Sequence, residues 1–211
     1  MIVHDVRQGE YEWLCLRLGI PTASRLDEIL TPKTLKLSAS SSGYMAELLA
    51  EWLLGEPLDS ASSLFMERGT ELEAEAVEWY EFTHGVTVER PGFCTTDNGK
   101  VGCSPDGLVG TEGGLEIKCL GAKEHVRALL APDEAHRGQI QGGLFVTGRK
   151  WWDLLRYHPT LPPVVLRFER DDDYIAALAD ALADFNERLE AGKETLKAKG
   201  CKPKPVKPQQ E

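Results

Sequence analysis

The stretch GCSPDGLVGTEGGLEIKC, residues 102–119, places Asp106, Glu116 and Lys118 in otherwise apolar or glycine-rich company. If its two halves pair as a hairpin around Thr111, Asp106 faces Glu116 directly, with Cβ atoms about 4.5–5.5 Å apart. Side chains alternate between the two faces of a strand, so Glu116 and Lys118 share a face. The sequence therefore predicts that the two acids and the lysine converge on one patch.

The opposite face of this hairpin is expected to be core. Leu115, Ile117 and Cys119 alternate with the charged residues, and the same register places Cys103 opposite Cys119. The cysteines of the chain form no CxxC pair and no zinc spacing. We therefore expect free, reduced thiols.

Two opposed carboxylates repel each other unless a cation or a shared proton lies between them. Hard oxygen ligands on neighbouring strands suit Mg²⁺ or Mn²⁺ better than zinc. A lysine beside such an ion can orient a water molecule and stabilise negative charge that develops on phosphorus. The pattern favours metal-assisted hydrolysis of a phosphate ester. The alternative is a surface hairpin in which Lys118 offsets two acids.

The overall charge restricts how such a protein could bind nucleic acid. The chain has 211 residues, 24 of them basic and 34 acidic, and a formal net charge of −10. Binding to phosphates then needs local basic clusters or bound cations. One cluster exists, because six lysines and a single acid lie between Lys193 and Lys207. No long apolar run and no signal-peptide core appear, so we expect a cytoplasmic protein without a membrane span.

Apolar spacing and turn residues divide the chain into elements. A short helix capped by Thr22 or Ser24 is expected first, and then a loop over 31–43. Longer helices are expected over 44–55, 62–83, 121–131, 133–146 and 172–197, and strands over 86–95, 101–109, 114–120, 150–158 and 164–170. This order predicts an α/β fold with a central mixed sheet flanked by helices. We expect one domain over 1–198 and a flexible Lys/Pro-rich tail over 199–211.

The motif CSPDGLVGTEGGLEIKC resembles the signature of PD-(D/E)XK nucleases, and specifically of the lambda exonuclease family of phage recombination nucleases. Three further segments are similar to that family in the same order, namely 12–24 (WLCLRLGIPTAS from Trp13), 68–86 and 138–157. The likeness covers roughly residues 10–190. It implies a PD-(D/E)XK nuclease-like core.

The resemblance also implies an activity and partners. Members of that family are Mg²⁺-dependent 5′→3′ exonucleases. They digest one strand of double-stranded DNA from its ends and leave 3′ single-stranded tails. For this chain we expect Mn²⁺ to substitute for Mg²⁺ and two ions to bind per site. A ring-shaped homotrimer, a single-strand annealing protein as partner and a bacterial or phage-infected host cell are implied in the same way.

Matching positions imply roles for individual residues. Asp106 and Glu116 match metal-binding acids, with the Ile117 carbonyl as a plausible further ligand, and Lys118 matches the lysine of the motif. Glu73 matches an acid on the preceding helix. Its spacing to the apolar residues further along that helix puts it at the border of the apolar face, although a solvated acid is the alternative.

Three more residues match positions outside the hairpin. Gln139 would help to organise the attacking water from a helix that Gly142 and Gly143 allow close to the sheet; the alternative is a half-exposed polar residue. Arg17 and Ser24 would hold the 5′-terminal phosphate, since arginine can grip phosphate through two N–H groups. An ordinary ion pair for Arg17 and a helix cap for Ser24 are the alternatives.

Two other functions remain open from the sequence. The same core could belong to a PD-(D/E)XK endonuclease or repair nuclease, which would cut a closed circular duplex. A non-catalytic DNA-end-binding protein would carry a degenerate site, whereas this chain has an intact D…ExK pattern. The exonuclease is the function that we expect.

Overall fold

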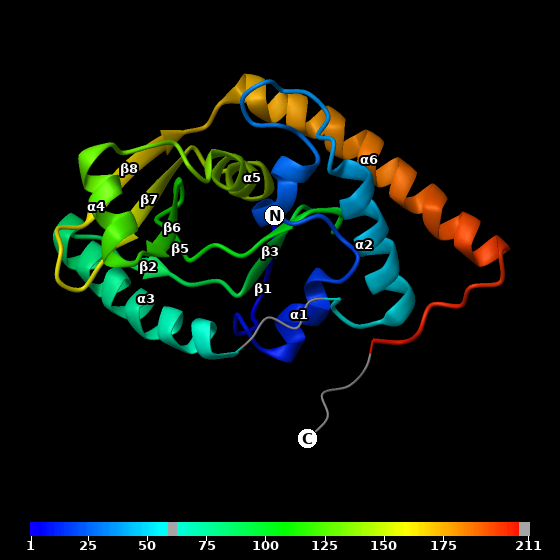
Figure 1. Cartoon of the computed structure of the whole chain (residues 1–211), viewed down its shortest axis with the longest axis horizontal. Helices are drawn as coiled ribbons and strands as arrows, with labels where there is room; N and C mark the ends of the chain where they lie inside the picture. The colour runs from blue at the N-terminus through cyan, green and yellow to red at the C-terminus, as the bar shows by residue number, and fades with distance from the viewer. Residues whose placement is uncertain (59–62, 207–211) are drawn as a thin grey trace.

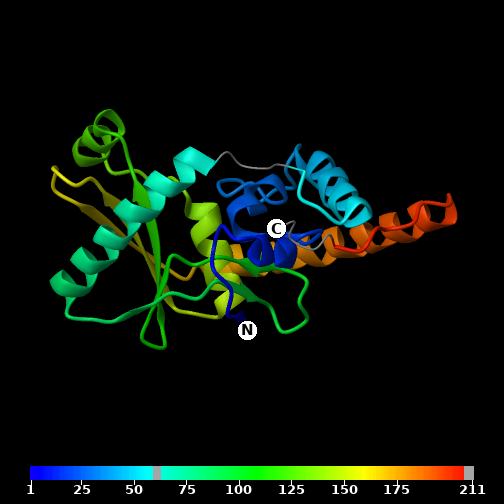
Figure 2. The same cartoon turned by 90° about the horizontal axis from the view of Figure 1, so that it is seen from below.

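The computed structural model describes residues 1–58 and 63–206, and the side chains of residues 63–71 are outside that description. Its helices are α1 (Tyr11–Arg17), the 3-10 helix η1 (Ala23–Glu28), α2 (Ser41–Leu54), α3 (Ser63–His84), α4 (Ala122–Leu130), α5 (Arg137–Thr147) and α6 (Asp172–Ala198). Its strands are β1 (Ile2–His4), β2 (Val88–Glu89), β3 (Phe93–Thr95), β4 (Gly102–Cys103), β5 (Gly107–Val109), β6 (Gly113–Cys119), β7 (Trp151–Tyr157) and β8 (Val164–Glu169). Figures 1 and 2 show their arrangement.

A five-stranded mixed sheet forms the centre, with the strand order β2-β5-β6-β7-β8. Only the β6–β7 pair is parallel among these strands of the described chain. Parallel neighbours need a long crossover, and α4 and α5 supply it. Helix α3 packs on one face of the sheet and α5 on the other (Figure 2). The predicted α/β fold is confirmed.

The two faces of β6 follow the alternation of its side chains. Leu115 and Ile117 pack with Ala76 and Tyr80 of α3 in one buried cluster. Glu116 and Lys118 therefore point to the opposite face, where α5 lies. On that face Leu144 of α5 packs in a second cluster with apolar residues of β7.

Two predicted strands are each broken in two. The prediction of one strand over 86–95 is wrong, because β2 and β3 belong to different sheets, with Pro91 between them. Likewise 101–109 is divided into β4 and β5, with Pro105 between them. Proline has no N–H to donate to a strand ladder, and each break falls at or beside one. β1, β3 and β4 form a separate three-stranded sheet.

The predicted hairpin register is right where the ladder exists and wrong beyond the break. Gly107 pairs with Leu115, as the register around Thr111 requires. Cys103, however, pairs with Cys94 of β3 and not with Cys119. All five thiols are free, as predicted.

A helical layer of α2 and α6 packs with η1 beside the sheets (Figure 1). Its core contains Leu26, Tyr44 and the buried side of α6 with Leu178, Leu182 and Phe185. The helix predicted over 172–197 matches α6 closely. Gly55, the last residue of the helix predicted over 44–55, ends α2 in a left-handed conformation.

The remaining boundaries differ in smaller ways. The helix predicted over 133–146 begins later, at Arg137. The short helix predicted after Thr22 or Ser24 is the 3-10 helix η1, whose N-cap Thr22 makes no side-chain cap hydrogen bond. Residue 62, the predicted start of the second long helix, lies outside the described residues. No helix of the described chain is both long and apolar enough to cross a membrane. The division into one domain and a tail stays a prediction.

Candidate active site

Glu116 and Lys118 meet on the α5 face of β6, as the alternation predicted. The Glu116 side chain is only 5% exposed, and its Oε1 lies 2.7 Å from the Lys118 Nζ. A buried carboxylate is costly unless charges or hydrogen-bond donors surround it. The strand therefore holds an ion pair inside the protein at the centre of the sheet.

Asp106 joins this pair from the connection between β4 and β5. Its Oδ2 accepts a 2.6 Å hydrogen bond from the backbone N–H of Ile117. Because Pro105 breaks the ladder just before it, the side chain of Asp106 takes the acceptor role that a backbone carbonyl would have in a continuous strand. The structure brings Asp106 and Glu116 into one pocket, although Asp106 is outside the strand and the β5–β6 ladder ends before the predicted pair.

The three charges shift one another's titration. Burial, followed by the charges of Glu116 and Glu73, raises the pKa of Asp106 well above its ordinary value. Burial also raises the pKa of Glu116, although Lys118 and Gln139 oppose this. Burial alone would lower the pKa of Lys118, but the neighbouring carboxylates outweigh it and the net shift is upward. The cluster thus holds more buried carboxylate than one ammonium group can neutralise.

Gln139 reaches the cluster from α5. Its Nε2 donates a 2.6 Å hydrogen bond to Oε1 of Glu116. Close packing of α5 makes this possible: a Cβ on Gly143 would lie 3.0 Å from the Trp152 ring of β7. The predicted close approach to the sheet therefore holds at Gly143. Gly142 packs instead against Leu26 of η1, where a Cβ would lie 2.8 Å from Cδ1.

Glu73 lies near the cluster and is held by a residue that the sequence reasoning missed. Its carboxylate forms an ion pair with Arg90, and its side chain is 25% exposed. Its charge contributes to the raised pKa of Asp106. Among residues 1–58 and 63–206, no three acids, cysteines or histidines are already grouped closely enough to hold a metal ion. Each of the three acids is instead engaged by its own donor.

Arg17 and Ser24 line the same pocket, which has a volume of about 240 Å³ and also contains Asp106, Glu116, Lys118 and Gln139. Nη1 of Arg17 donates to Oγ of Ser104 at 3.1 Å, and its guanidinium lies 4.3 Å from the centre of the Trp13 ring. Burial lowers the pKa of Arg17. Arg17 therefore does not form the ordinary surface ion pair that the sequence left open as the alternative; its partners are a hydroxyl and an aromatic ring.

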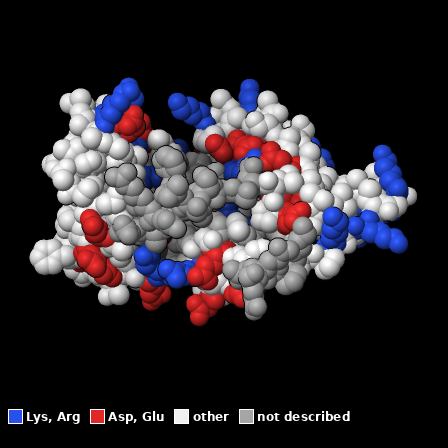
Figure 3. All heavy atoms as spheres, turned by 60° about the horizontal axis from the view of Figure 1, so that its bottom comes forward, with Lys and Arg blue, Asp and Glu red and all other residues white. Residues whose placement is uncertain are grey.

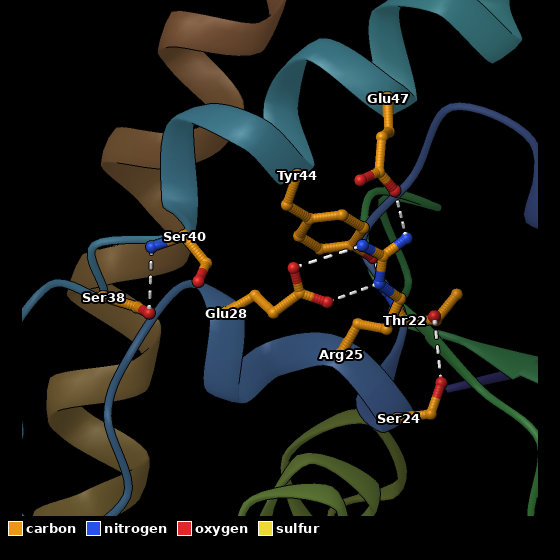
Figure 4. A network of polar contacts seen from close by, with 8 residues as sticks. All are labelled: Thr22, Ser24, Arg25, Glu28, Ser38, Ser40, Tyr44 and Glu47. Atoms are coloured by element: carbon orange, nitrogen blue, oxygen red, sulfur yellow. Dashed lines mark hydrogen bonds and ion pairs between the residues drawn. The ribbon is translucent and has the colours of Figure 1, made fainter.

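Ser24 stands at the start of η1, and its Oγ lies 3.4 Å from Oγ1 of Thr22 (Figure 4). The neighbouring Arg25 turns away from it and is engaged elsewhere. It bonds Glu28 at 2.6 Å and Glu47 at 2.5 Å and stacks on the Tyr44 ring (Figure 4). Arg17 is thus the arginine of this region that faces the pocket.

Trp13 and Ser104 were not among the predicted site residues. Nε1 of Trp13 donates to Oγ of Ser104 at 2.8 Å, so both side chains fix the position of Arg17. Helical spacing offered a signal for Trp13, which lies four residues before Arg17 and hence on the same face of α1. Ser104 lies two residues before Asp106, but nothing in its local sequence indicates a contact with α1.

Comparisons with known proteins concern the family and the fold of the chain. Residues 12–150 match the model of the family described as YqaJ-like viral recombinase domain. The crystal structure of an alkaline exonuclease (LHK-Exo) from Laribacter hongkongensis is similar, with 36% identity and a TM-score of 0.79 over 90% of this chain and 98% of that one. A second structure of that exonuclease, in complex with dAMP, matches with the same figures.

A crystal structure of a phage related exonuclease from Haemophilus somnus 129PT has a similar fold. Its TM-score is 0.62 at 15% identity, over 84% of this chain and 96% of that one. A search of curated protein sequences returned no match. The family match, the 36% identity and the fold lead to one conclusion. The chain belongs to the YqaJ-like viral recombinase family, as its resemblance to lambda exonuclease predicted, and it is a viral recombinase-like nuclease with a PD-(D/E)XK-like fold.

Proposed function

We propose that this protein is a Mg²⁺-dependent 5′→3′ exonuclease that digests one strand of double-stranded DNA from its ends and leaves 3′ single-stranded tails. One observation carries the proposal: a single pocket contains a buried acid, a half-buried acid, a lysine, a glutamine and an arginine. Phosphodiester hydrolysis needs groups that position a water molecule, groups that offset phosphate charge and a grip on the substrate.

The donor set fits a hard divalent cation. Asp106 and Glu116 offer carboxylate oxygens in a buried site, Glu73 lies close by, and the backbone carbonyl of Ile117 is a further candidate ligand. Mg²⁺ prefers such oxygen ligands, and Mn²⁺ accepts the same ones. When bound, the ion would offset negative charge on the phosphate and lower the pKa of a coordinated water molecule. Two ions per site is our expectation from the number of acids.

The residues of the chain have separate tasks in this proposal. Lys118, held 2.7 Å from Glu116, orients the attacking water and stabilises charge as it develops on phosphorus. Gln139 fixes one oxygen of Glu116 through its amide N–H, so the carboxylate keeps one orientation while it serves as a ligand. The catalytic group thus combines residues of β6, α5 and the β4–β5 connection.

Directionality would come from the other end of the pocket. The Arg17 guanidinium, stacked on Trp13 and bonded to Ser104, offers fixed N–H donors to a terminal phosphate, and the Ser24 hydroxyl can add another. A phosphate held there stands at a set distance from the acids, which selects the bond that is cut. The dAMP complex of the Laribacter exonuclease supports a site that accepts a nucleoside monophosphate.

Assembly and partners follow as proposals from the family. We infer a homotrimeric ring, a single-strand annealing protein as partner, and a cytoplasmic location where DNA recombines. Chromatography with light scattering tests the trimer. The proposed hydrolysis in the pocket does not depend on the trimer, the annealing partner or the location.

Linear and circular DNA test the proposed activity. With Mg²⁺, a linear duplex with 5′-phosphate ends should be digested faster than one with 5′-hydroxyl ends, and a closed circular duplex should remain intact. EDTA should stop the reaction. Cutting of the circle would indicate an endonuclease instead, and binding to ends without any digestion in Mg²⁺ would indicate a non-catalytic protein.

A further inference from the structure

The segment after α6 contains a cluster of positive charge that the proposed active site does not use. Lys199, Lys202 and Lys204 are exposed, and none of the three takes part in an ion pair with a described residue. Two lysines just before them, Lys193 and Lys197, are paired with Glu190 and Glu194. Basic side chains, drawn in blue, gather at this end of the molecule in Figure 3. We call Lys199, Lys202 and Lys204 the basic segment.

Backbone contacts hold the basic segment against the helical layer. The N–H of Lys204 donates to the Leu53 carbonyl at the end of α2, at 2.9 Å. The N–H of Cys201 donates a 3.0 Å hydrogen bond to the Leu196 carbonyl of α6. A Cβ on Gly55 would lie 2.5 Å from the Pro205 carbonyl oxygen, so the chain passes closely over the end of α2. The three lysines are therefore presented from a fixed backbone.

The basic segment also runs toward the helix that carries Arg17. In Figures 1 and 2 the chain turns back from the end of α6 and passes the end of α2 toward α1. Contacts link the same elements: the N–H of Gly19, just after α1, donates to Glu51 of α2, and Gly19 packs against Trp52. One helix separates the basic segment from the end of α1.

We propose that the basic segment binds the phosphodiester backbone of the DNA duplex whose end lies in the Arg17 pocket. The chain is acidic overall, with a net charge of −10, so most of its surface repels a polyanion. Three unpaired ammonium groups on a docked backbone offset that repulsion at one place. This proposal rests on the exonuclease function proposed above, and it concerns the grip on the duplex rather than the chemistry.

Salt dependence tests the proposal most sharply. The variant K199Q/K202Q/K204Q removes the basic segment, and K100Q/K123Q/K150Q removes three other exposed lysines with the same change in net charge. Binding of a fluorescent duplex with 5′-phosphate ends is measured by anisotropy, without metal, from low to moderate salt. KM and kcat for digestion are measured in Mg²⁺.

The first variant should bind the duplex about tenfold more weakly at low salt, and its plot of log K against log salt should be less steep by about 1 to 3. KM should rise while kcat at saturating DNA stays the same. K199R/K202R/K204R should restore both values, because arginine keeps the charge. The control triple should match the wild type.

Two results would overturn the proposal. One is an equal salt slope and affinity for the two glutamine triples, and the other is a failure of the arginine triple to restore binding. A wild-type protein that does not digest linear DNA at all would instead remove the exonuclease function, so the two failures are distinguishable.

Discussion

Two arginines in the described part of the chain stack on tryptophans. One of them is paired with a carboxylate, and the other is bonded to a neutral group. Arg167 of β8 lies 3.8 Å from the centre of the Trp151 ring and holds both oxygens of Asp153 at 2.8 Å. Arg17 lies 4.3 Å from the Trp13 ring, and its hydrogen bond goes to the neutral hydroxyl of Ser104. The first arginine is neutralised by a buried carboxylate, whereas the second has no acidic partner in its hydrogen bond and keeps its charge for a pocket.

The buried acids repeat this contrast. Asp153 is 1% exposed and also accepts a 2.6 Å hydrogen bond from the Tyr80 hydroxyl, so its partners are complete. Asp106 and Glu116 share one lysine, and burial raises the pKa of each. The charges of Glu116 and Glu73 add to this shift at Asp106, and the charge of Glu73 adds to it at Glu116. We call the Tyr80–Asp153–Arg167 group the closed cluster and the Asp106–Glu116–Lys118 group the open cluster. A complete set of partners serves stability, and a deficit of positive charge leaves room for a ligand.

The largest effect is expected from the open cluster. Asp106→Asn keeps an acceptor for the Ile117 N–H but removes one negative charge. Cleavage of linear duplex DNA should fall by at least about 10²–10³-fold, since removal of a single stabilising group of this kind has that effect in other enzymes. The free energy of unfolding should be unchanged or higher, because a buried and poorly neutralised acid is lost.

Digestion assays in Mg²⁺ and urea unfolding measure the two quantities for Asp106→Asn. Retained cleavage would remove Asp106 from the site. A loss of both cleavage and stability would mean that the open cluster is structural like the closed one.

The closed cluster should show the reverse behaviour. Asp153→Ala leaves the Tyr80 hydroxyl and the Arg167 guanidinium without their acceptor. Arg167 is 49% exposed and can regain water, so the expected loss is about 2–4 kcal/mol in the free energy of unfolding. Activity per folded molecule should change little. Urea unfolding with activity normalised to folded protein checks this, and a variant that is stable but inactive would contradict it.

Arg17→Lys tests the role of the Arg17 guanidinium while the positive charge is retained. Lysine lacks the planar fork and stacks poorly on Trp13, so the preference for a 5′-phosphate over a 5′-hydroxyl end should fall about tenfold. Initial digestion rates on the two duplexes give the ratio. The matched change Arg167→Lys should leave that preference untouched. An unchanged preference in Arg17→Lys would place the phosphate pocket elsewhere.

The smallest effect concerns the helix that carries Gln139. Gly143→Ala places a methyl group 3.0 Å from the Trp152 ring, so α5 must shift by a few tenths of an ångström. We expect a loss of about 1 kcal/mol in stability and a few-fold decrease in activity. Gly43→Ala, in α2 with nothing within 4 Å, is the control and should be neutral or slightly stabilising. Thermal unfolding and digestion rates compare the two, and equal behaviour would argue against tight packing at Gly143.

The predictions from sequence succeeded where the signal is local. Alternation along β6 correctly separates Glu116 and Lys118 from Leu115 and Ile117, and the apolar spacing that predicts a helix over 172–197 matches α6. These periodicities depend only on the geometry of a strand or a helix.

The errors concern partners that lie far apart in the chain. Cys103 pairs with Cys94 because a break at Pro105 moves β4 into a second sheet, and the segments 2–4 and 93–95 carry no pattern that predicts their pairing. Two side-chain contacts also join residues of separate elements and were missed: the ion pair of Glu73 with Arg90 and the hydrogen bond between Trp13 and Ser104. Each depends on how separate elements dock, which no local periodicity encodes.

The most direct test of the open cluster is the change in melting temperature when Mg²⁺ is added without DNA. A ligand that binds only the folded protein stabilises it by RT ln(1 + L/Kd), where L is the ligand concentration, and this gain keeps growing with the logarithm of L above Kd. The Tm of the wild type should rise with the concentration of Mg²⁺ and of Mn²⁺, while Asp106→Asn should gain little and Asp153→Asn should respond as the wild type does. An absent shift in the wild type, or an equal shift in Asp106→Asn, would contradict a divalent cation site formed by these acids.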